Sequence, residues 1–307
     1  KHIEVSVRFD KPREQIGEDL MKSNRVFENI IHGVFLLLGL ITVGCVLLIT
    51  VYLIISGIPA IKEIGLVKFL FGKEWASTAA EPKFGILPMI LSSICGTFGA
   101  ILIGVPLGVL TAVFICYLAP KKLCSFLTAV VELLAGIPSV VFGLVGMIVL
   151  GPAVAKAFHL SSGANLLSAM LALAVMILPT IVSVTVTSLK AVPQEYSDGS
   201  LALGGTEVTT IFKMNVPAAK SGIITGIVLG VGRAIGETMA IIMVSGNVVN
   251  MPGIFKSVRF LTTGIVSEMS YAAGLHREAL IATGVVLFVF ILLMNLCFSV
   301  LKRGKKA

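Results

Sequence analysis

Residues 30–55 read IIHGVFLLLGLITVGCVLLITVYLII, a run of 26 residues without a single Asp, Glu, Lys or Arg. An α-helix rises about 1.5 Å per residue, so the run is about 39 Å long as a helix. The hydrocarbon core of a bilayer is about 30 Å thick. Because a soluble protein has no need of so long an uncharged run, the stretch predicts a helix that crosses a membrane.

Five more apolar stretches are long enough to cross a bilayer. They lie at Gly85–Tyr117, Phe126–Leu150, Leu166–Leu189, Ser221–Gly246 and Glu278–Leu301. The whole chain is 56% hydrophobic and only 13% charged, whereas soluble domains carry about 25% charged residues. The sequence therefore predicts an all-α integral membrane protein with six transmembrane helices over residues 30–301, flanked by segments 1–29 and 302–307.

Lys and Arg predict the orientation of these helices. Fifteen of the 24 lie in segments 1–26, 119–125, 190–220 and 302–307, and eight lie in the alternate loops. Since cytoplasmic loops of membrane proteins are enriched in Lys and Arg, we expect both termini to be cytoplasmic. A charged stretch, Lys1–Glu28, precedes the first apolar run, so we expect that run to stay as an anchor rather than act as a cleaved signal.

Several functional classes are disfavoured by composition. The net charge of +8 is spread in short blocks with no basic face interleaved with aromatic residues, which argues against a nucleic-acid partner. The five cysteines lie in or beside apolar runs without a CxxC pair, and the four histidines are scattered. We therefore expect no metal site, no disulfide framework and no membrane enzyme.

Prolines predict interruptions in three of the spans. The second span is too long for the bilayer, and Ile103-Gly104-Val105-Pro106 is its expected break point. Pro138 and Pro179 are expected to interrupt the third and fourth spans. Such interruptions are tolerated where helices pack together or line a cavity, and a simple packing kink is the alternative at each proline.

Two loops on the expected outer side, 57–84 and 248–277, are too long to be mere turns. The first holds Trp75, the one tryptophan of the chain. Tryptophan near a membrane surface is typically an interfacial anchor. The alternative is that these loops form a docking surface for an external partner.

The loop over residues 190–220 is the most informative polar segment. A short amphipathic helix is expected from Pro193 to Leu203, and Gly204-Gly205 permits a reversal through positive φ. Thr206 is expected to cap a second short helix, which carries Val208, Ile211 and Phe212. Apolar faces on such short helices fit a groove on another protein, or the loop folds back against its own bundle; the spacing leaves both open.

Arg233 and Glu237 lie inside the fifth apolar stretch. Each charge costs roughly 2.5–3.5 kcal/mol near the bilayer centre. At a separation of four residues on a helix they share one face and are expected to pair. Their retention suggests a transport pathway, and a structural ion pair is the alternative. Glu132, near the cytoplasmic end of the third span, is either a pathway residue or an interfacial carboxylate.

This charge set does not favour tight anion binding. Arg233 and Glu237 sum to zero, and Glu132 makes the trio negative, whereas a tight phosphate site needs several donors or more than one cation. Hydroxyls can contribute, although in spans they often bond their own backbone; the candidates are Thr97, Thr185, Thr187 and Thr238. We therefore expect a low-affinity pathway, which also lets the substrate leave.

The 190–220 loop resembles a known motif. Asp198-Gly199-Ser200, then Gly204, then Met214, Val216 and Pro217 are similar to the EAA loop of bacterial ABC import permeases, with Asp-Gly-Ser in place of the consensus Glu-Ala-Ala.

Other segments resemble phosphate permeases of this type in the same order along the chain, from about residue 30 to 300. They are Gly232-Arg233-Ala234-Ile235-Gly236-Glu237-Thr238-Met239-Ala240, Glu132–Val141, Phe71–Trp75 and Gly274-Leu275-His276. Met239 after Thr238 favours the PstC-like subunit family over its PstA-like partner.

The resemblance implies a MetI-like type I importer fold and a phosphate importer in the bacterial plasma membrane. It implies as partners a PstA-like permease, a PstB-like ATPase dimer that uses ATP and Mg, and a PstS-like phosphate-binding protein. Arg233 would contact phosphate or hold a gate, Glu237 would orient Arg233, and the loop would insert into the ATPase. This chain has no GxxxxGK[ST] motif, so ATP is expected to bind elsewhere.

Three other functions remain as alternatives: an ATP-independent secondary transporter, a channel for an inorganic oxyanion, and a phosphate-sensing membrane scaffold. No inverted repeat is visible in the sequence, which counts against the first.

Overall fold

A computed structural model describes the backbone of residues 13–303 and the side chains of residues 28–297. The expected segment 1–29 and tail 302–307 therefore lie largely outside the described residues. The chain divides into two compact units, Lys1–Ile54 and Ile55–Ala307. The first unit is described by helix α1 (Arg13–Ile64), which continues into the second. Residues 30–49 of α1 are exposed along its whole circumference, as a lipid-facing helix requires.

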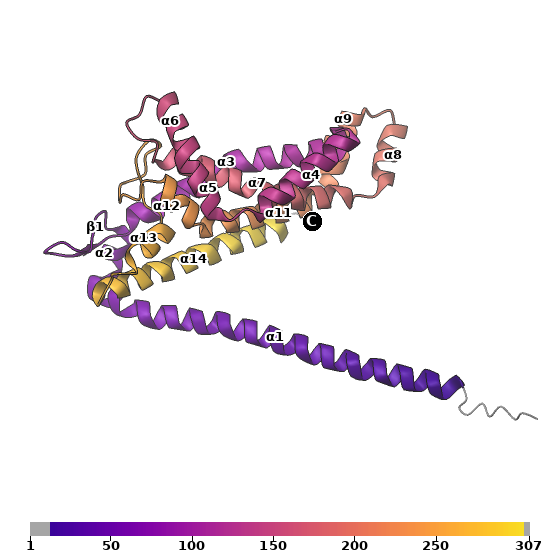
Figure 1. The fold of residues 1–307 in the computed structure, drawn as a ribbon, viewed down its shortest axis with the longest axis horizontal. Coiled ribbons are helices and arrows are strands. Elements are labelled where there is room, and N and C mark those ends of the chain that lie inside the picture. Colours follow the sequence, from indigo (N-terminus) through magenta and orange to yellow (C-terminus); the bar gives the residue numbers. More distant parts are fainter. Residues whose placement is uncertain (1–12, 304–307) are drawn as a thin grey trace, which may run out of the picture. The chain divides into compact units, whose positions relative to one another are not determined.

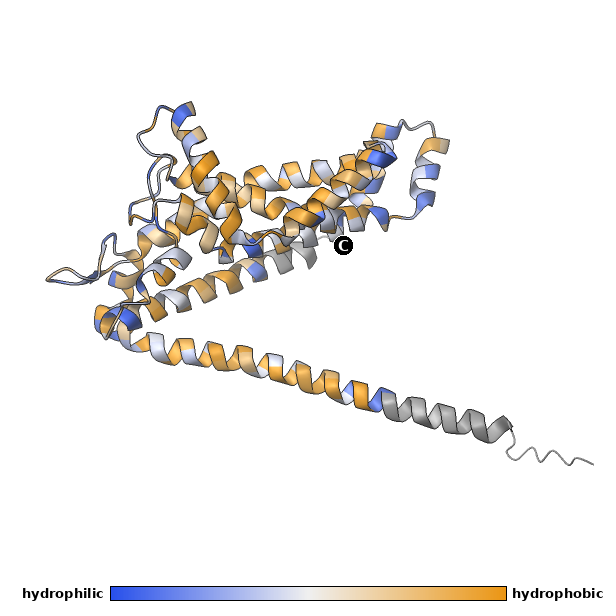
Figure 2. Ribbon diagram, in the orientation of Figure 1, coloured by the Kyte–Doolittle hydropathy of each residue, from blue (hydrophilic) through white to orange (hydrophobic). Residues whose placement is uncertain are grey.

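The second unit is a bundle of helices with two short strands (Figure 1). Its long helices are α3 (Leu87–Val113), α7 (Leu166–Lys190), α11 (Lys220–Gly236) and α14 (Leu275–Arg303). The helix α3 continues as a π-helical turn, η1 (Phe114–Leu118). In Figure 2 apolar residues run along α14 and α3, whereas hydrophilic residues gather on α8 and in loops.

Shorter elements complete the unit. On one side of the bundle lie α2 (Leu66–Phe71), the strands β1 (Trp75–Ala76) and β2 (Lys83–Phe84), and α13 (Leu261–Glu268). The strands pair antiparallel, with Trp75 opposite Phe84. Between α7 and α11 lie α8 (Gln194–Ala202), α9 (Glu207–Thr210), the π-helical turn η3 (Ile211–Asn215) and α10 (Val216–Ala218).

The expected architecture of six apolar spans is confirmed. Among the described residues, five helices are long and apolar enough to cross a membrane: Glu28–Ile64, Leu87–Leu118, Ser139–Ala157, Leu166–Lys190 and Leu275–Cys297. A sixth is obtained when Glu207–Ala218 and Lys220–Gly236, bent by 69°, are counted as one.

The third and fifth predicted spans are each built from separate helices. The predicted third span, Phe126–Leu150, covers most of α4 (Lys121–Gly136), α5 (Ser139–Val145) and the π-helical turn η2 (Gly146–Leu150). The helix α6 (Gly151–Ala157) continues beyond the predicted end of this span. The fifth consists of α11 and α12 (Met239–Val244).

Only one of the three predicted proline breaks is present. Pro138 separates α4 from α5, because Ile137 takes the extended conformation that a following proline favours (ψ 129°). The predicted breaks at Pro106 and Pro179 are wrong, since α3 and α7 run through them. These two helices pack closely: a Cβ added to Gly104 would lie 2.8 Å from Ile177 Cδ1. Such contact between small and large residues holds the helices together across the lost hydrogen bonds.

The core of the bundle surrounds α7. Of the most apolar 18-residue stretch of this helix, 61% is buried. The central cluster joins Leu173, Ile177 and Ile181 of α7 to residues of α3, α11 and α12. A second cluster lies at the end of the bundle that carries α8 and includes Val186 and Ile223. A third cluster lies at the opposite end and includes Phe69, Phe84 and Leu261. The outer face of the bundle is therefore left to lipid or to partner chains.

Candidate functional site

The fifth span breaks at Glu237 and Thr238. The helix α11 ends at Gly236, and Glu237 takes an extended conformation (φ −69°, ψ 133°) before α12 begins at Met239. The Oε1 atom of Glu237 accepts a hydrogen bond of 3.0 Å from the backbone N–H of Ala240. A carboxylate in this place satisfies an unpaired N–H group of α12 and interacts favourably with the positive end of the helix dipole.

The predicted ion pair between Arg233 and Glu237 is not formed. Their spacing places two side chains on one face only if the helix continues, and here it ends one residue before Glu237. The Nη1 atom of Arg233 instead donates to Thr180 Oγ1 at 3.5 Å. Within the described part of the chain Arg233 forms no ion pair with a carboxylate, so a half-buried positive charge without an ion-pair partner lies one turn before the break.

The remaining predicted pathway residues divide between two places. Thr238 lies at the same break, where its hydroxyl donates to Gly236 O at 3.4 Å. Glu132 is exposed on α4 and lines a separate cavity of about 540 Å³ with Lys121 and Lys190. Glu237 and Thr238 form the break and Arg233 lies one turn before it, but no described contact joins Arg233 or Glu132 to Glu237 or Thr238.

The other candidate hydroxyls offer little to a substrate. Thr97 is buried, and Thr187 donates to Ser183 O of its own helix at 3.0 Å. Thr185 is fully buried and its Oγ1 atom makes no hydrogen bond within the described structure. The anion-binding capacity of the break therefore rests on Arg233.

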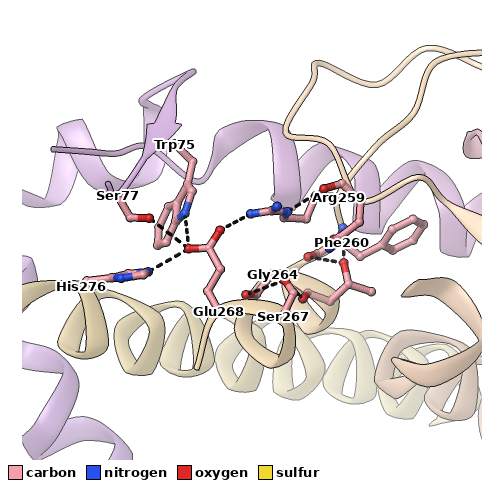
Figure 3. A network of polar contacts seen from close by, with 10 residues as sticks. Trp75, Ser77, Arg259, Phe260, Gly264, Ser267, Glu268 and His276 are labelled. Atoms are coloured by element: carbon pink, nitrogen blue, oxygen red, sulfur yellow. Dashed lines mark hydrogen bonds and ion pairs between the residues drawn. The ribbon is translucent and has the colours of Figure 1, made fainter. Parts of the chain in front are cut away.

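A buried carboxylate that sequence reasoning missed joins the two long outer loops (Figure 3). Glu268, at the end of α13, accepts hydrogen bonds from Trp75 Nε1 (2.9 Å), Ser77 Oγ (3.2 Å) and His276 Nε2 (2.8 Å). Its other oxygen forms an ion pair with Arg259, whose Nε atom also donates to Asn247 O at 3.1 Å. Burial alone would raise the pKa of Glu268, but the hydrogen bonds from Trp75, His276 and Arg259 outweigh it and lower that pKa.

The helix α13 also contacts the break in the fifth span. Thr262, in its first turn, donates from Oγ1 to the backbone carbonyl of Glu237 at 2.9 Å. The last residue of the same helix is Glu268. One short helix is therefore bonded to the candidate pathway at one end and to the outer loops at the other.

The segment between α7 and α11 largely has the predicted form. The helix α8 covers Gln194–Ala202, Gly204 has φ +84°, and Thr206 Oγ1 caps α9 by accepting from Thr209 N at 3.3 Å. Gly204 alone provides the reversal, because Gly205 is not among the described residues with positive φ.

The interpretation in which the segment folds back on its own bundle is confirmed in part, and the groove on another protein stays a prediction. The helix α8 is bonded to α9 and η3 of its own segment, because Ser197 bonds Asn215 and Ser200 bonds Thr210 at 2.8 Å. The segment in turn packs on the bundle through Ile211 of η3, which lies in one buried cluster with Val186 of α7. One edge of the segment is open: Leu203 is 92% exposed, and Tyr196, Leu201 and Val208 are also exposed. Of the other motif residues, Asp198, Gly199 and Pro217 are exposed. The segment is therefore anchored on its own bundle and presents an unpartnered apolar edge.

Comparisons with known proteins place this arrangement in a family. Residues 104–306 match the model of the binding-protein-dependent transport system inner membrane component, which covers more than half of the chain. The chain belongs to this family of transport permeases.

Curated relatives of the permease include the "Probable ABC transporter permease protein YqgH" of Bacillus subtilis (strain 168), 36% identical over 87% of this chain and 88% of that protein. The phosphate transport system permease protein PstC of Mesorhizobium japonicum is 34% identical over 74% of this chain and 75% of its own length. PstC 1 of Mycobacterium bovis is 35% identical over 69% and 70%. These relatives are transport subunits rather than enzymes.

Solved structures share the fold of the permease at low identity. A bacterial alginate ABC transporter in complex with an alginate-bound periplasmic protein aligns over 93% of this chain and 94% of its own, with a TM-score of 0.60 and 16% identity. The methionine ABC transporter MetNI, in an inward-facing conformation, aligns over 71% and 95%, with a TM-score of 0.57 and 18% identity. The MetI-like importer fold and its setting as a multi-pass inner membrane protein are thereby confirmed.

Two partners of Glu268 were within reach of the sequence, although Trp75 was interpreted as an interfacial anchor or as part of a docking surface. Trp75 and His276 both lie in segments that resemble phosphate permeases, so their shared role as donors could have been sought. Glu268 and Arg259 carry no such signal, because nothing in their spacing shows that they meet. No group of three His, Cys, Asp or Glu side chains suited to a metal ion occurs among the described residues.

Proposed function

We propose that this permease is the PstC-like subunit of an ATP-driven phosphate importer and forms half of the pathway. The single observation that carries the proposal is the unpaired Arg233 at the broken fifth span. It offers a guanidinium, a good partner for phosphate oxygens, in a place where a buried charge is otherwise costly. The PstC relatives support phosphate as the anion.

A single guanidinium without an ion-pair partner is suited to a pathway that phosphate passes through rather than to a site that binds phosphate tightly. Tight phosphate binding requires several charged donors, and the break provides one, next to the carboxylate of Glu237, which is engaged by Ala240 N. Selectivity would then reside in a PstS-like phosphate-binding protein that docks on the outer side. A PstA-like permease would form the other half of the pathway.

The exposed edge of α8 fits coupling to a PstB-like ATPase dimer, in which ATP and Mg would be bound. Because Leu203, Tyr196 and Leu201 have no partner in the described chain, an apolar groove on that ATPase would cover them. In this orientation the end of the bundle with α8 faces the cytoplasm, as do both termini.

The test is phosphate uptake by the complete complex in proteoliposomes. Arg233→Gln is expected to abolish uptake of labelled phosphate while all subunits still co-purify, and Arg233→Lys is expected to retain part of it. Arg277→Gln, which removes an exposed charge in the first turn of α14, is the matched control and is expected to transport normally. Normal uptake by Arg233→Gln would refute the pathway role.

The same preparation tests the alternatives. Phosphate flux through the chain alone, driven by an ion gradient without ATP, would identify a secondary transporter or channel. Binding of all partners without any flux would identify a sensing scaffold.

A further inference from the structure

A second polar cavity lies away from the broken span, at the end of the bundle that carries α8. Its volume is about 540 Å³, and it is bordered by η1, by α4 and by Lys190, the last residue of α7. Because α8 begins only four residues after Lys190, the cavity lies close to the proposed ATPase-coupling segment. No part of the Arg233 site belongs to it.

The polar residues of α4 form one stripe along the cavity. Lys121, Ser125, Thr128 and Glu132 all line it, and they are separated by four, three and four residues. This spacing places them on one face of the helix, over a length of about 17 Å. The stripe borders a shallow, open cavity, and most of its side chains are exposed there.

The donors in this cavity are not used within the described structure. Lys121 and Lys190 form no ion pair there, and the hydroxyls of Ser125 and Thr128 make no hydrogen bond. Two ammonium groups and two hydroxyls therefore border one cavity without a described partner. Ammonium groups make short, charge-assisted bonds to phosphate oxygens, so the set matches an oxyanion better than any neutral ligand.

Glu132 adds a constraint on which oxyanion fits. A carboxylate repels a fully ionised oxyanion but accepts a hydrogen bond from one that keeps a proton. Phosphate and phosphomonoesters keep a proton on part of the population near neutral pH, since their second pKa is about 6–7. Sulfate keeps none. The acceptor and the two cations together favour a protonated phosphoryl group.

We propose that this cavity is a binding site for a protonated phosphoryl oxyanion, held by Lys121, Lys190, Ser125 and Thr128 and selected by Glu132. The inference rests on the proposed function for the orientation of the chain. Two sources share this chemistry: inorganic phosphate that has passed through the complex, and the phosphomonoester headgroup of phosphatidic acid in the inner leaflet.

Cys124 provides a local probe, because it lines the same cavity and is partly exposed. The experiment measures how fast the neutral reagent iodoacetamide alkylates Cys124, by mass spectrometry of its peptide, in the intact complex in nanodiscs. Inorganic phosphate, sulfate and no anion are compared in phosphatidylcholine discs. The no-anion measurement is repeated in discs that contain phosphatidic acid.

Saturable protection of Cys124 by phosphate, with weaker protection by sulfate, is the expected result for inorganic phosphate. Loss of one charge-assisted bond in Lys121→Gln or Lys190→Gln should weaken protection roughly tenfold. Lys122→Gln is the matched control, because Lys122 is exposed on the same turn and does not line the cavity. Glu132→Gln is expected to remove the preference over sulfate.

Protection by phosphatidic acid alone, with no further effect of phosphate, would support the site and assign it to the lipid. Absence of protection by either, or an equal effect of Lys122→Gln, would overturn the site. Unchanged selectivity in Glu132→Gln would overturn the role of Glu132. Phosphate uptake measured on the same complex separates the two proposals, because uptake without protection refutes this site alone, and protection without uptake refutes the proposed function alone.

Discussion

Replacing Glu268 by Gln is expected to loosen the outer loops of the permease, although the side chain keeps its size. Glu268 is 5% exposed and faces four side-chain donors: Trp75, Ser77, Arg259 and His276. A carboxylate can accept all four bonds, whereas an amide turns one NH₂ group toward groups that only donate. The guanidinium of Arg259 is left half-buried without its counter-ion.

The magnitude follows from these contacts. Removing one partner of a buried ion pair costs about 3–5 kcal/mol, because the other charge stays buried. If the loss is confined to local opening of the loops, a change of this size accelerates hydrogen exchange by more than about 100-fold. The affected amides should lie in residues 75–84 and 259–276, the two segments that the carboxylate joins.

Hydrogen exchange of the purified chain in nanodiscs, read by mass spectrometry, is the assay. Glu74→Gln is the matched control, because Glu74 pairs with Lys83 in the same region but is exposed, so its removal should change exchange little. Equal hydrogen exchange of these segments in Glu268→Gln and in the native chain would refute the reasoning, since it would show that the contacts of Glu268 do not stabilise the outer loops against opening.

The lowered pKa of Glu268 gives the same idea a pH dependence. A carboxyl group whose pKa is lower in the folded state stabilises fully above its unfolded pKa of about 4.3, and this contribution is lost as the pH falls through the folded pKa. The native outer loops should therefore open as the pH falls below about 4. Glu268→Gln should lack this opening at low pH. An identical pH dependence of hydrogen exchange in the two proteins would contradict the prediction.

Three further predictions concern backbone and surface positions. Gly204→Val places a β-branched residue at φ +84°, which costs roughly 1–3 kcal/mol, and should reduce phosphate-stimulated ATP hydrolysis by the complex. Gly39→Val, at an exposed helical position of α1 with open space around it, is the comparison. Leu203→Asp, at a side chain that is 92% exposed, should leave the thermal stability of the isolated chain unchanged but weaken co-purification of the ATPase; retained ATPase would refute that contact. Gly143→Val would bring its Cβ to about 2.8 Å from Ala240 Cα, so it should lower thermal stability, whereas Gly136→Val, which has open space around it, should be milder.

The sequence predicted the spans well because membrane insertion depends on local composition. An uncharged run such as 30–55 is a span whatever its neighbours do, and the loop helix from Pro193 with its reversal at Gly204 is likewise decided by local residue types. Prolines were predicted less well, because their effect depends on packing. Pro138 breaks its span, while Pro106 lies within a helix held by close contact between Gly104 and Ile177.

The candidate site shows the same limit. Arg233, Glu237 and Thr238 were selected from charge and hydroxyl groups inside an apolar run, and all three lie at or within one turn of the break in the fifth span. Their pairing was predicted wrongly because it assumed an unbroken helix, and the break after Gly236 is fixed by contacts of α12 and α13 with distant residues. The bond between Trp75 and Glu268 spans 193 residues, a separation that no local pattern reveals.

The eight-residue helix α13 is about 12 Å long and has no free end. Its first turn holds the carbonyl of Glu237 through Thr262, and its last residue holds both outer loops through Glu268. A rigid rod fixed at both ends cannot shift at one end alone. A displacement of the outer loops that keeps the contacts of both Glu268 and Thr262 must therefore also move the backbone of Glu237, so that α13 links the outer loops of the permease to the break in its fifth span.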